Sequence, residues 1–362
     1  MGLAGFGQRL RDQGLSSTVV ETLLDARAPS TRTQYDARWR QFSAWCGEQV
    51  PSVDPLQAQP GLVLSFLQSL LAKGRCFSTI KGMVAAITAC QSGIVSPLSE
   101  HPLVKDLLKA AKRKSSTARP LLPPWDLGLV LDALCEPPFE PLDGLGLDVL
   151  TIKTVFLLAI TTAKRVSDLH ALSVHDECMS WSNGGRSVRL QSNPVFVSKT
   201  QRVASYARLE AFHPPPFSSD QDRRLHNICP LRALRLYVQR TKDIRGEVSQ
   251  LFVTHGPGRA AGKAASKPTL SRWIVEAIRM AYSSRGVEPP TGLRAHSSRA
   301  QATSWALFKG VSLQEVCDAA NWSSGLTFAD FYSLDVAAPS LAQAVLGVAD
   351  TAVSGVGSEA RA

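Results

Sequence analysis

Three short segments of the sequence carry side chains that could act together on a phosphate ester. In chain order, these side chains belong to Arg165, Asp168, His296, Arg299, Trp322 and Tyr332. His296 and Arg299 are three residues apart, so a helix would place both on one face, about 5–6 Å apart between Cβ atoms. Arginine can hold two phosphate oxygens at once through its planar fork. The segments therefore predict an anion-binding site with a nucleophile.

Tyr332 is the candidate nucleophile. Its phenolic oxygen would attack phosphorus and keep the bond energy in a phosphotyrosine ester, so neither ATP nor a metal ion is required. Tyrosine side chains ordinarily have a pKa of about 10, and His296 would therefore assist in proton transfer. Trp322 can donate its ring N–H to a phosphate oxygen, and Asp168 would orient its neighbours. We expect no cofactor and no metal.

The order and spacing of these residues resemble the catalytic domain of the tyrosine recombinases, the family that includes the phage integrases. That family carries an early arginine followed by an acid, a lysine in a β-hairpin, His-x-x-Arg, and a His or Trp ahead of the tyrosine. The resemblance implies that the catalytic residues are Arg165, Lys199, His296, Arg299, Trp322 and Tyr332. Lys199 lies between two strand-like stretches and would protonate the leaving 5′-oxygen. Arg202 or Lys164 could be mistaken for this lysine.

The sequence departs from the family pattern at two points. Ala163 and Lys164 stand where the family usually has a glycine just before the first arginine. The interval from Trp322 to Tyr332 is ten residues, one longer than the commonest spacing. Neither departure removes a reacting group, but both leave room for an altered site.

The resemblance implies a site-specific recombinase or integrase that cleaves and rejoins double-stranded DNA through a 3′-phosphotyrosine intermediate. It also implies a homo-tetramer on paired DNA sites and a mobile element as the source. The ending from Trp322 to Tyr332 looks most like the recombinases of DIRS-type retrotransposons. Two alternatives stay open from the residues: a type IB topoisomerase, which shares the chemistry, and a domesticated DNA-binding protein that no longer cuts DNA.

Composition and charge agree with a nucleic-acid partner. The chain has 362 residues and a formal charge of +10, which favours a polyanion. The seven cysteines are scattered, without the spacing of a zinc site or a disulfide framework. No apolar run approaches the ~20 residues of a membrane span, and the first residues are not a secretory signal. We expect a soluble intracellular protein, nuclear in a eukaryote and otherwise cytoplasmic, with no membrane partner.

Hydrophobic periodicity predicts two domains. Residues 1–28 form a helical or loose leader, and residues 29–115 form an α-helical domain that resembles the family's core-binding (SAM-like) domain. Its first helix carries an aromatic stripe at helical spacing, made of Tyr35, Trp39, Phe42 and Trp45. Further helices are expected over 62–72, 78–92 and 101–114, and the last has an apolar face of Leu103, Leu107, Leu108 and Ala111.

Basic side chains gather on the last two helices of this domain. They are Arg75, Lys81, Lys105, Lys109, Lys112, Arg113 and Lys114. A solvated helix face, a nuclear-import signal and a contact to the DNA backbone are all compatible with such a cluster, and these interpretations can coexist.

A proline-rich linker over 116–124 leads to the catalytic domain, residues 125–350. Helices are expected over 126–134, 150–161, from Arg165, and over 230–240, 270–282, 296–309 and 313–320; strands are expected over 187–190, 193–198 and 204–211. The predicted fold class is therefore mainly α with a small antiparallel β-sheet. Ser312 and Glu315 match a capping box.

The segment after Tyr332 is expected to act between subunits. Pro339 can start a short helix with one apolar face, formed by Leu341, Val345 and Val348. In the family that this chain resembles, such a helix docks on the adjacent copy. Residues 351–362 are rich in Gly, Ser and Ala and are expected to form a disordered tail.

Overall fold

A computed structural model describes residues 2–93, 96–114, 122–196, 206–212, 214–256 and 261–336. Lys199, Arg202 and the helix and tail expected after Pro339 lie outside these residues. The chain divides into unit 1, Met1–Arg119, and unit 2, Pro120–Ala362. None of the helices in the described stretches is both long and apolar enough to cross a membrane.

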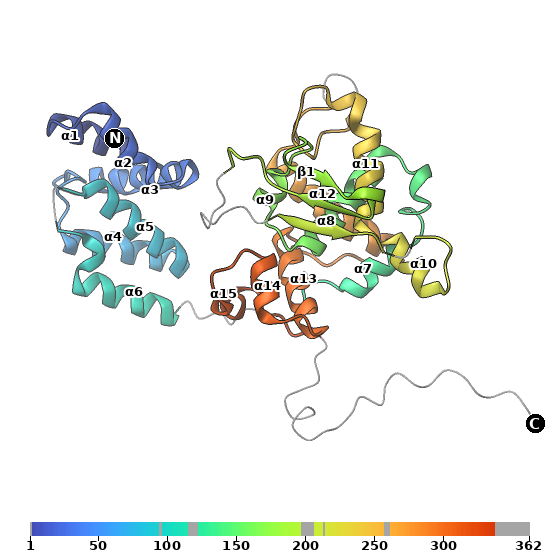
Figure 1. Ribbon diagram of the computed structural model, residues 1–362. Coiled ribbons are helices and arrows are strands. Elements are labelled where there is room, and N and C mark those ends of the chain that lie inside the picture. Colours follow the sequence, from blue (N-terminus) through green and yellow to red (C-terminus); the bar gives the residue numbers. More distant parts are fainter. Residues whose placement is uncertain are drawn as a thin grey trace, which may run out of the picture. The chain divides into compact units, whose positions relative to one another are not determined.

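All the regular secondary structure that is described in unit 1 is helical (Figure 1). In chain order they are α1 (Gly2–Asp12), α2 (Ser17–Asp25), α3 (Pro29–Gly47), α4 (Pro60–Ala72), α5 (Phe77–Gln91), the 3-10 helix η1 (Leu98–Glu100) and α6 (Pro102–Lys114). Proline at the start of α3 and α4 presets the backbone for a first helical turn. The predicted helices of this unit are confirmed.

The aromatic stripe of α3 forms the centre of the core of unit 1. Trp39 and Phe42 are buried, and their ring centroids lie 5.8 Å apart. Phe66 of α4 contacts Phe42 at 5.1 Å and Trp45 at 5.3 Å between centroids. Tilted aromatic pairs at these distances add to the stabilisation from burial, so this stripe joins α3 to α4.

Residues 1–28, expected to form a helical or loose leader, contain α1 and α2; α1 contacts α3 and α5, and Leu3 is buried in the core of the unit. One feature of unit 1 differs from the sequence prediction. Leu103 was expected on the apolar face of α6, but its side chain is 58% exposed. Val104 is buried instead, two turns before the buried Ala111, and residues seven apart share a helix face.

Unit 2 combines helices with a small antiparallel sheet, in agreement with the predicted fold class (Figure 1). Its helices are α7 (Leu127–Ala133), η2 (Leu142–Gly144), α8 (Leu147–Thr162), α9 (Val166–His170), η3 (Asn183–Gly185), α10 (Asp220–Asn227), α11 (Pro230–Arg245), α12 (Lys267–Ser284), α13 (His296–Phe308), α14 (Leu313–Ala319) and α15 (Gly325–Phe331). Its strands are β1 (Met179–Trp181), β2 (Ser187–Leu190) and β3 (Ala207–Glu210), in the order β1-β2-β3. Val188 of β2 pairs with Trp181 and Leu209.

The sheet differs from the prediction in one strand. The strand expected over 193–198 is absent from its described part, residues 193–196, where the Phe196 N–H donates to the Asn193 carbonyl at 2.8 Å and closes a turn. Pro194 cannot donate to a strand ladder. The sequence pattern also missed β1, α10 and α15, which are short elements.

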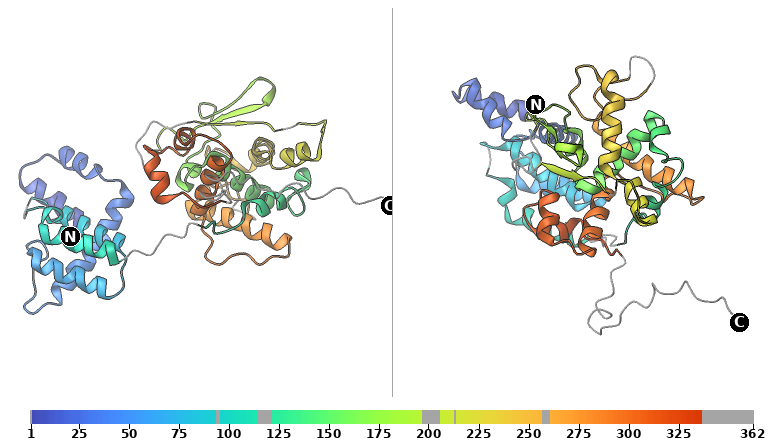
Figure 2. Two further views of the ribbon diagram at one scale, coloured as in Figure 1. Left: turned by 90° about the horizontal axis from the view of Figure 1, so that it is seen from below. Right: turned by 45° about the vertical axis from the view of Figure 1, so that its right-hand side comes forward.

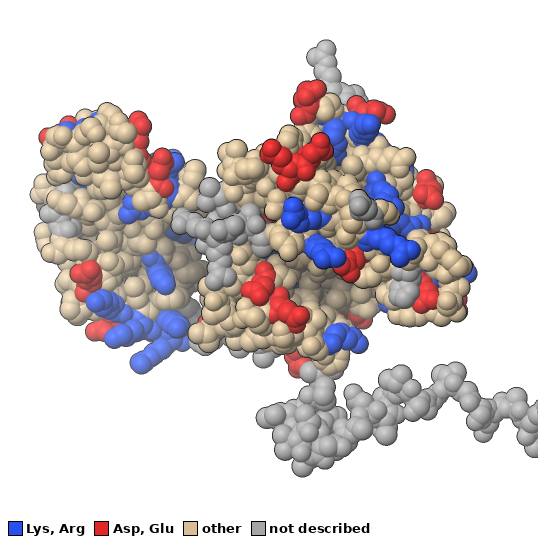
Figure 3. Space-filling view, in the orientation of Figure 1, with Lys and Arg blue, Asp and Glu red and all other residues tan. Residues whose placement is uncertain are grey.

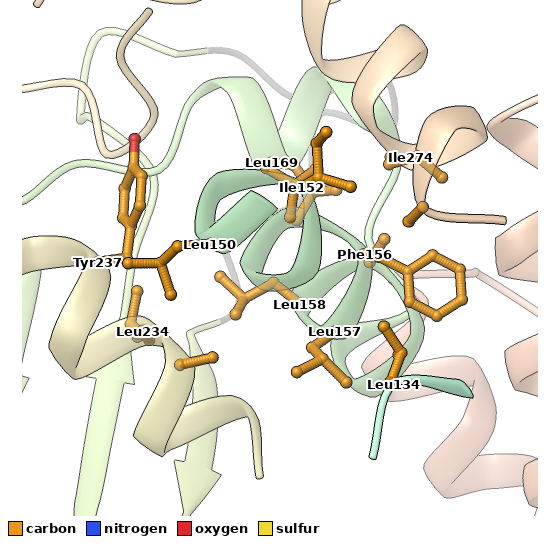
Figure 4. Close-up of a cluster of buried hydrophobic side chains, with 14 of the residues drawn as sticks. Leu134, Leu150, Ile152, Phe156, Leu157, Leu158, Leu169, Leu234, Tyr237 and Ile274 are labelled. Carbon is orange, nitrogen blue, oxygen red and sulfur yellow. The ribbon is translucent and has the colours of Figure 1, made fainter. Parts of the chain in front are cut away.

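Helix α8 is the buried axis of unit 2. It contacts α11, α12 and α13, and its apolar side chains point in several directions: Leu150 lies beside Tyr237, whereas Phe156 points to the other side (Figure 4). A helix that is apolar all round is a buried helix. The surrounding helices therefore fix the C-terminal end of α8, where Arg165 follows.

One charged side chain of α8, Lys153, is fully buried. Its ammonium group donates to the carbonyl oxygens of Leu134 at 2.9 Å and Phe139 at 3.1 Å, and to Glu140 Oε1 at 2.5 Å. Arg232 of α11 holds both oxygens of the same carboxylate, at 2.8 and 3.1 Å. Burial lowers the pKa of Lys153, and Glu140 opposes this effect. These ion pairs join α8, α11 and the connection between α7 and α8.

Replacing Lys153 by methionine should destabilise unit 2 strongly, because Glu140 and two buried carbonyls lose their donor. Removing one partner of a buried ion pair costs about 3–5 kcal/mol. The matched control is Lys109→Met, which removes an exposed pair with Asp106 at 3.2 Å and should cost less than ~1 kcal/mol. Urea unfolding measures both, and equal small losses would show that Lys153 does not anchor α8.

Candidate active site

A left-handed turn at the end of α8 positions Arg165. Helix α8 ends at Thr162, and Ala163 then adopts φ 48° and ψ 24°. Arg165 caps α9, with its backbone N–H donating to Asp168 Oδ2 at 3.2 Å. Its guanidinium Nη1 lies 4.0 Å from the same carboxylate oxygen. Asp168 therefore contacts both the backbone and the guanidinium of Arg165 in this turn.

Arg299 lies one turn into α13, and its side chain is 2% exposed. Its Nη2 donates to the carbonyl oxygen of Ala320. Nε and Nη1 of Arg299, and Nη1 of Arg165, are buried without a hydrogen-bond partner among the described residues. Buried donors without acceptors cost free energy, so these three N–H groups are suited to the oxygens of a bound anion.

Two aromatic rings contact the guanidinium of Arg299. Its central carbon lies 4.8 Å from the ring centroid of Trp322 and 5.4 Å from that of Tyr332. The two rings are 4.5 Å apart, and the exposed His296 lies 5.3 Å from Tyr332 between centroids. Cations are attracted to aromatic faces at such distances. The arrangement places the predicted nucleophile beside one arginine and the histidine of its own chain.

The electrostatics of the site centre on Arg299. Burial and, to a smaller extent, the neighbouring Arg165 lower its pKa to about 10, and Tyr332 and Asp168 oppose these effects. At neutral pH the guanidinium still carries its charge. The site thus holds two cationic forks close together in a poorly solvated place, which is the environment in which a phosphate gains most from charged donors.

Helices α13, α14 and α15 lie side by side, and Tyr332 follows the last of them (Figures 1 and 2). The capping box of Ser312 and Glu315 at the start of α14 is confirmed. Tyr332 follows α15 directly, and its N–H donates to the Phe328 carbonyl at 2.8 Å. Asn321 takes φ 53° just before Trp322, a conformation that asparagine tolerates better than most residues.

Ser304 is a positioning residue that the sequence pattern missed. Its hydroxyl donates to the Tyr332 carbonyl at 3.2 Å and accepts from the Leu334 N–H at 2.9 Å. Ser304 is buried on α13, so it ties the backbone of the nucleophile to the helix that carries His296 and Arg299. The indication that the sequence offered for Ser304 was its position as a small polar residue on the inner side of a predicted helix.

The structure brings together six of the predicted residues: Arg165, Asp168, His296, Arg299, Trp322 and Tyr332. Lys199 belongs to the segment between β2 and β3, outside the described residues, so its role remains a prediction.

The basic residues predicted to contact DNA are exposed on unit 1. They are Arg75, Lys81, Lys105, Lys109, Lys112, Arg113 and Lys114. Figure 3 shows blue side chains gathered around the end of α6. Lys109 pairs with Asp106 on the same helix.

Solved structures of DNA recombinases have a similar fold. XerH site-specific recombinase, in a post-cleavage complex with palindromic difH, is 15% identical with a TM-score of 0.54, over 83% of this chain and 76% of XerH. An integrase of the transposon Tn1549, bound to transposon right-end DNA, is 13% identical with a TM-score of 0.51, over 96% and 99% of the two chains. A lambda integrase dimer bound to a COC′ core site is 15% identical with a TM-score of 0.50, over 92% and 95%.

No protein-family model and no curated protein matches the sequence. At the identities of the three solved structures, the likeness shows the fold. That fold is an α-helical core-binding domain followed by a tyrosine recombinase catalytic domain.

The turn at Ala163 gives a prediction for stability. Glycine at position 163 would remove the strain of the left-handed backbone conformation, roughly 1–2 kcal/mol. The substitution would also remove the methyl group of Ala163, which packs in the cluster of Trp322 and Tyr332 and contributes about 0.8 kcal/mol. Ala163→Gly should therefore leave the free energy of unfolding unchanged or raise it slightly.

Ala159→Gly is the matched control, because Ala159 is buried in the interior of α8. Glycine should destabilise that position by about 1 kcal/mol through helix propensity alone. Thermal or urea unfolding of both variants measures the difference, and equal losses would mean that Ala163 is not strained.

Proposed function

We propose that the chain is a site-specific DNA recombinase that cleaves and rejoins duplex DNA through a covalent bond to Tyr332. The observation that carries the proposal is the contact of Tyr332 with a buried arginine, beside His296, and two nitrogens of that arginine have no hydrogen-bond partner among the described residues. Its fold is similar to that of recombinases solved with DNA, which supports the same substrate.

The residues of the site suit a transesterification. Arg165 and Arg299 hold the non-bridging oxygens of the scissile phosphate, and Trp322 donates its ring N–H to one of them. The phenolic oxygen of Tyr332 attacks phosphorus while its proton passes to His296. The bond from phosphorus to the 5′-oxygen breaks, and Lys199 protonates that oxygen. A 5′-hydroxyl of another strand reverses these steps and releases Tyr332.

The exposed basic residues of unit 1 supply contacts to the DNA backbone in this proposal. Phosphate contacts by Lys and Arg give affinity without reading sequence. The source that we propose is a mobile element, most similar to DIRS-type retrotransposons in the ending from Trp322 to Tyr332, and the place of action in a eukaryote would be the nucleus.

The covalent step is tested with a pool of nicked duplexes whose sequence around the nick is randomised. The wild-type protein should form adducts that survive denaturation, also in EDTA. Tyr332→Phe should form none, while a gel shift shows DNA binding close to that of the wild type, because only the phenolic oxygen is lost.

A mixture of the Tyr332→Phe and Arg299→Lys proteins tests whether Tyr332 acts with Arg299 of its own chain or serves a neighbouring copy. Lysine replaces the planar fork by a point charge, and loss of one such donor lowers rates by about 10²–10³. Tyr332 contacts Arg299 of its own chain, so the mixture should stay as inactive as its parts. Restored adducts would show that Tyr332 serves a neighbouring copy, and a wild type without adducts would contradict the proposed function.

We propose further that copies assemble on paired sites through the C-terminal segment, as a homo-tetramer. Large apolar side chains are exposed just beside the nucleophile's helices: Leu307, Phe308, Val311 and Leu313. Exposed apolar groups of this size in one short stretch favour an interface. The segment after Val336 carries its own apolar positions, Leu341, Val345 and Val348, so we assign this surface to that segment of the neighbouring copy.

Deleting residues 338–362 should leave binding to a single site nearly unchanged but reduce cooperative assembly and strand exchange. Gel shifts and cross-linking on DNA with two sites compare the truncated and full-length proteins. The substitution Leu341→Asp in the full chain should reproduce the defect. Full assembly and exchange by the truncated protein would refute this role of the segment.

A further inference from the structure

Lys164 lies between two residues that belong to the site. Ala163 packs in the cluster that contains Trp322 and Tyr332, and Arg165 caps α9. The side chain of Lys164 is partly buried, although a lysine in the three-residue connection between α8 and α9 could extend into solvent. The left-handed turn at Ala163 thus presents Lys164 and Arg165 together at the end of α8.

The surroundings of Lys164 are those of the site itself. Burial lowers its pKa, Asp168 raises it, and Arg299 lowers it. Asp168 also raises the pKa of Arg299, and its carboxylate oxygen Oδ2 lies 4.0 Å from Arg165 Nη1. Lys164, Arg165 and Arg299 are therefore three cations gathered around one carboxylate, that of Asp168. Like charges in a partly buried place repel one another, and a bound anion relieves that repulsion.

The charge of the reacting group changes during the proposed transesterification. A phosphodiester carries one negative charge, and attack by the oxygen of Tyr332 places further negative charge on its non-bridging oxygens. Donors aimed at charge that develops in the transition state accelerate the reaction more than donors that bind the ground state equally well. A third cation beside Arg165 and Arg299 is suited to that added charge.

We propose that Lys164 is a further catalytic residue, whose ammonium group contacts a non-bridging oxygen of the scissile phosphate and stabilises the charge that develops there. This inference rests on the proposed function and extends it, because Lys199 retains the separate role of protonating the leaving oxygen.

The test compares Lys164→Met with the wild type on a duplex recovered in the adduct assay. Methionine keeps most of the length and removes the charge. The rate of adduct formation should fall about 10²-fold, while Lys164→Arg keeps a cation and retains most of the rate. The matched control, Lys242→Met, removes an exposed lysine of α11 and should leave the rate unchanged. Thermal unfolding checks that each variant is folded.

Two modified substrates distinguish contact with the phosphate oxygen from other roles. A methylphosphonate at the scissile position removes the charge that Lys164 would stabilise, so the gap between Lys164→Met and wild type should narrow to a few-fold. A bridging 5′-sulfur leaves without a proton, and the gap should persist with that substrate.

Three results would overturn the inference. Lys164→Met could react as fast as the control variant, or its defect could be the same on both modified substrates. In the third result, only the 5′-sulfur substrate would restore the rate of Lys164→Met, which would make Lys164 the proton donor. In each of these three cases, the proposed function still holds if the wild type forms adducts that depend on Tyr332. A wild type without adducts removes the proposed function and this inference with it.

Discussion

The contact of the Arg299 guanidinium with the rings of Trp322 and Tyr332 is the interaction on which the site depends. The guanidinium comes from α13, whereas the rings come from the end of α14 and the end of α15, so one side chain fixes three helices. Attraction between a desolvated cation and an aromatic face contributes up to about 2 kcal/mol. This partly offsets the cost of burying a charge that donates to a single carbonyl.

Two buried cations of unit 2 illustrate opposite uses of burial. Lys153 has all its donors on carbonyl and carboxylate oxygens, so it stabilises the core and has no capacity left for a ligand. Arg299 keeps Nε and Nη1 without acceptors in the part of the chain that the structure describes. Binding of an anion would satisfy them without moving the rings, because the guanidinium is already in place. The free energy that the fold gives up at Arg299 is available for phosphate binding, as expected of a preorganised site.

The packing of α8 positions Arg165, the second arginine of the site. Helices contact α8 on several sides, and the strained turn at Ala163 directs Arg165 back towards Arg299, as the effect of Arg165 on the pKa of Arg299 shows. Alanine at that turn costs more than glycine would, yet its methyl group is buried beside Trp322 and Tyr332. Contact with the nucleophile's cluster thus offsets the backbone strain.

The sequence by itself determined which residues could do the chemistry and much of the helical framework. His296 and Arg299 share a helix face, the stripe of α3 is buried, and Ser312 caps α14, because these relations act within one or two helical turns. Residue types also identified Tyr332 and the arginines, since few side chains can hold or attack a phosphate.

Only the tertiary structure decided the contacts between distant segments. Ser304 binds the backbone of a residue 28 positions away, and Trp322 meets Arg299 through the packed helices α13 to α15. The left-handed turn at Ala163 and the exposure of Leu103 depend on neighbours that no local pattern contains. Local propensity reaches only a few residues along the chain, whereas the cluster around Tyr332 exists only when α8, α13 and α15 bury one another's side chains.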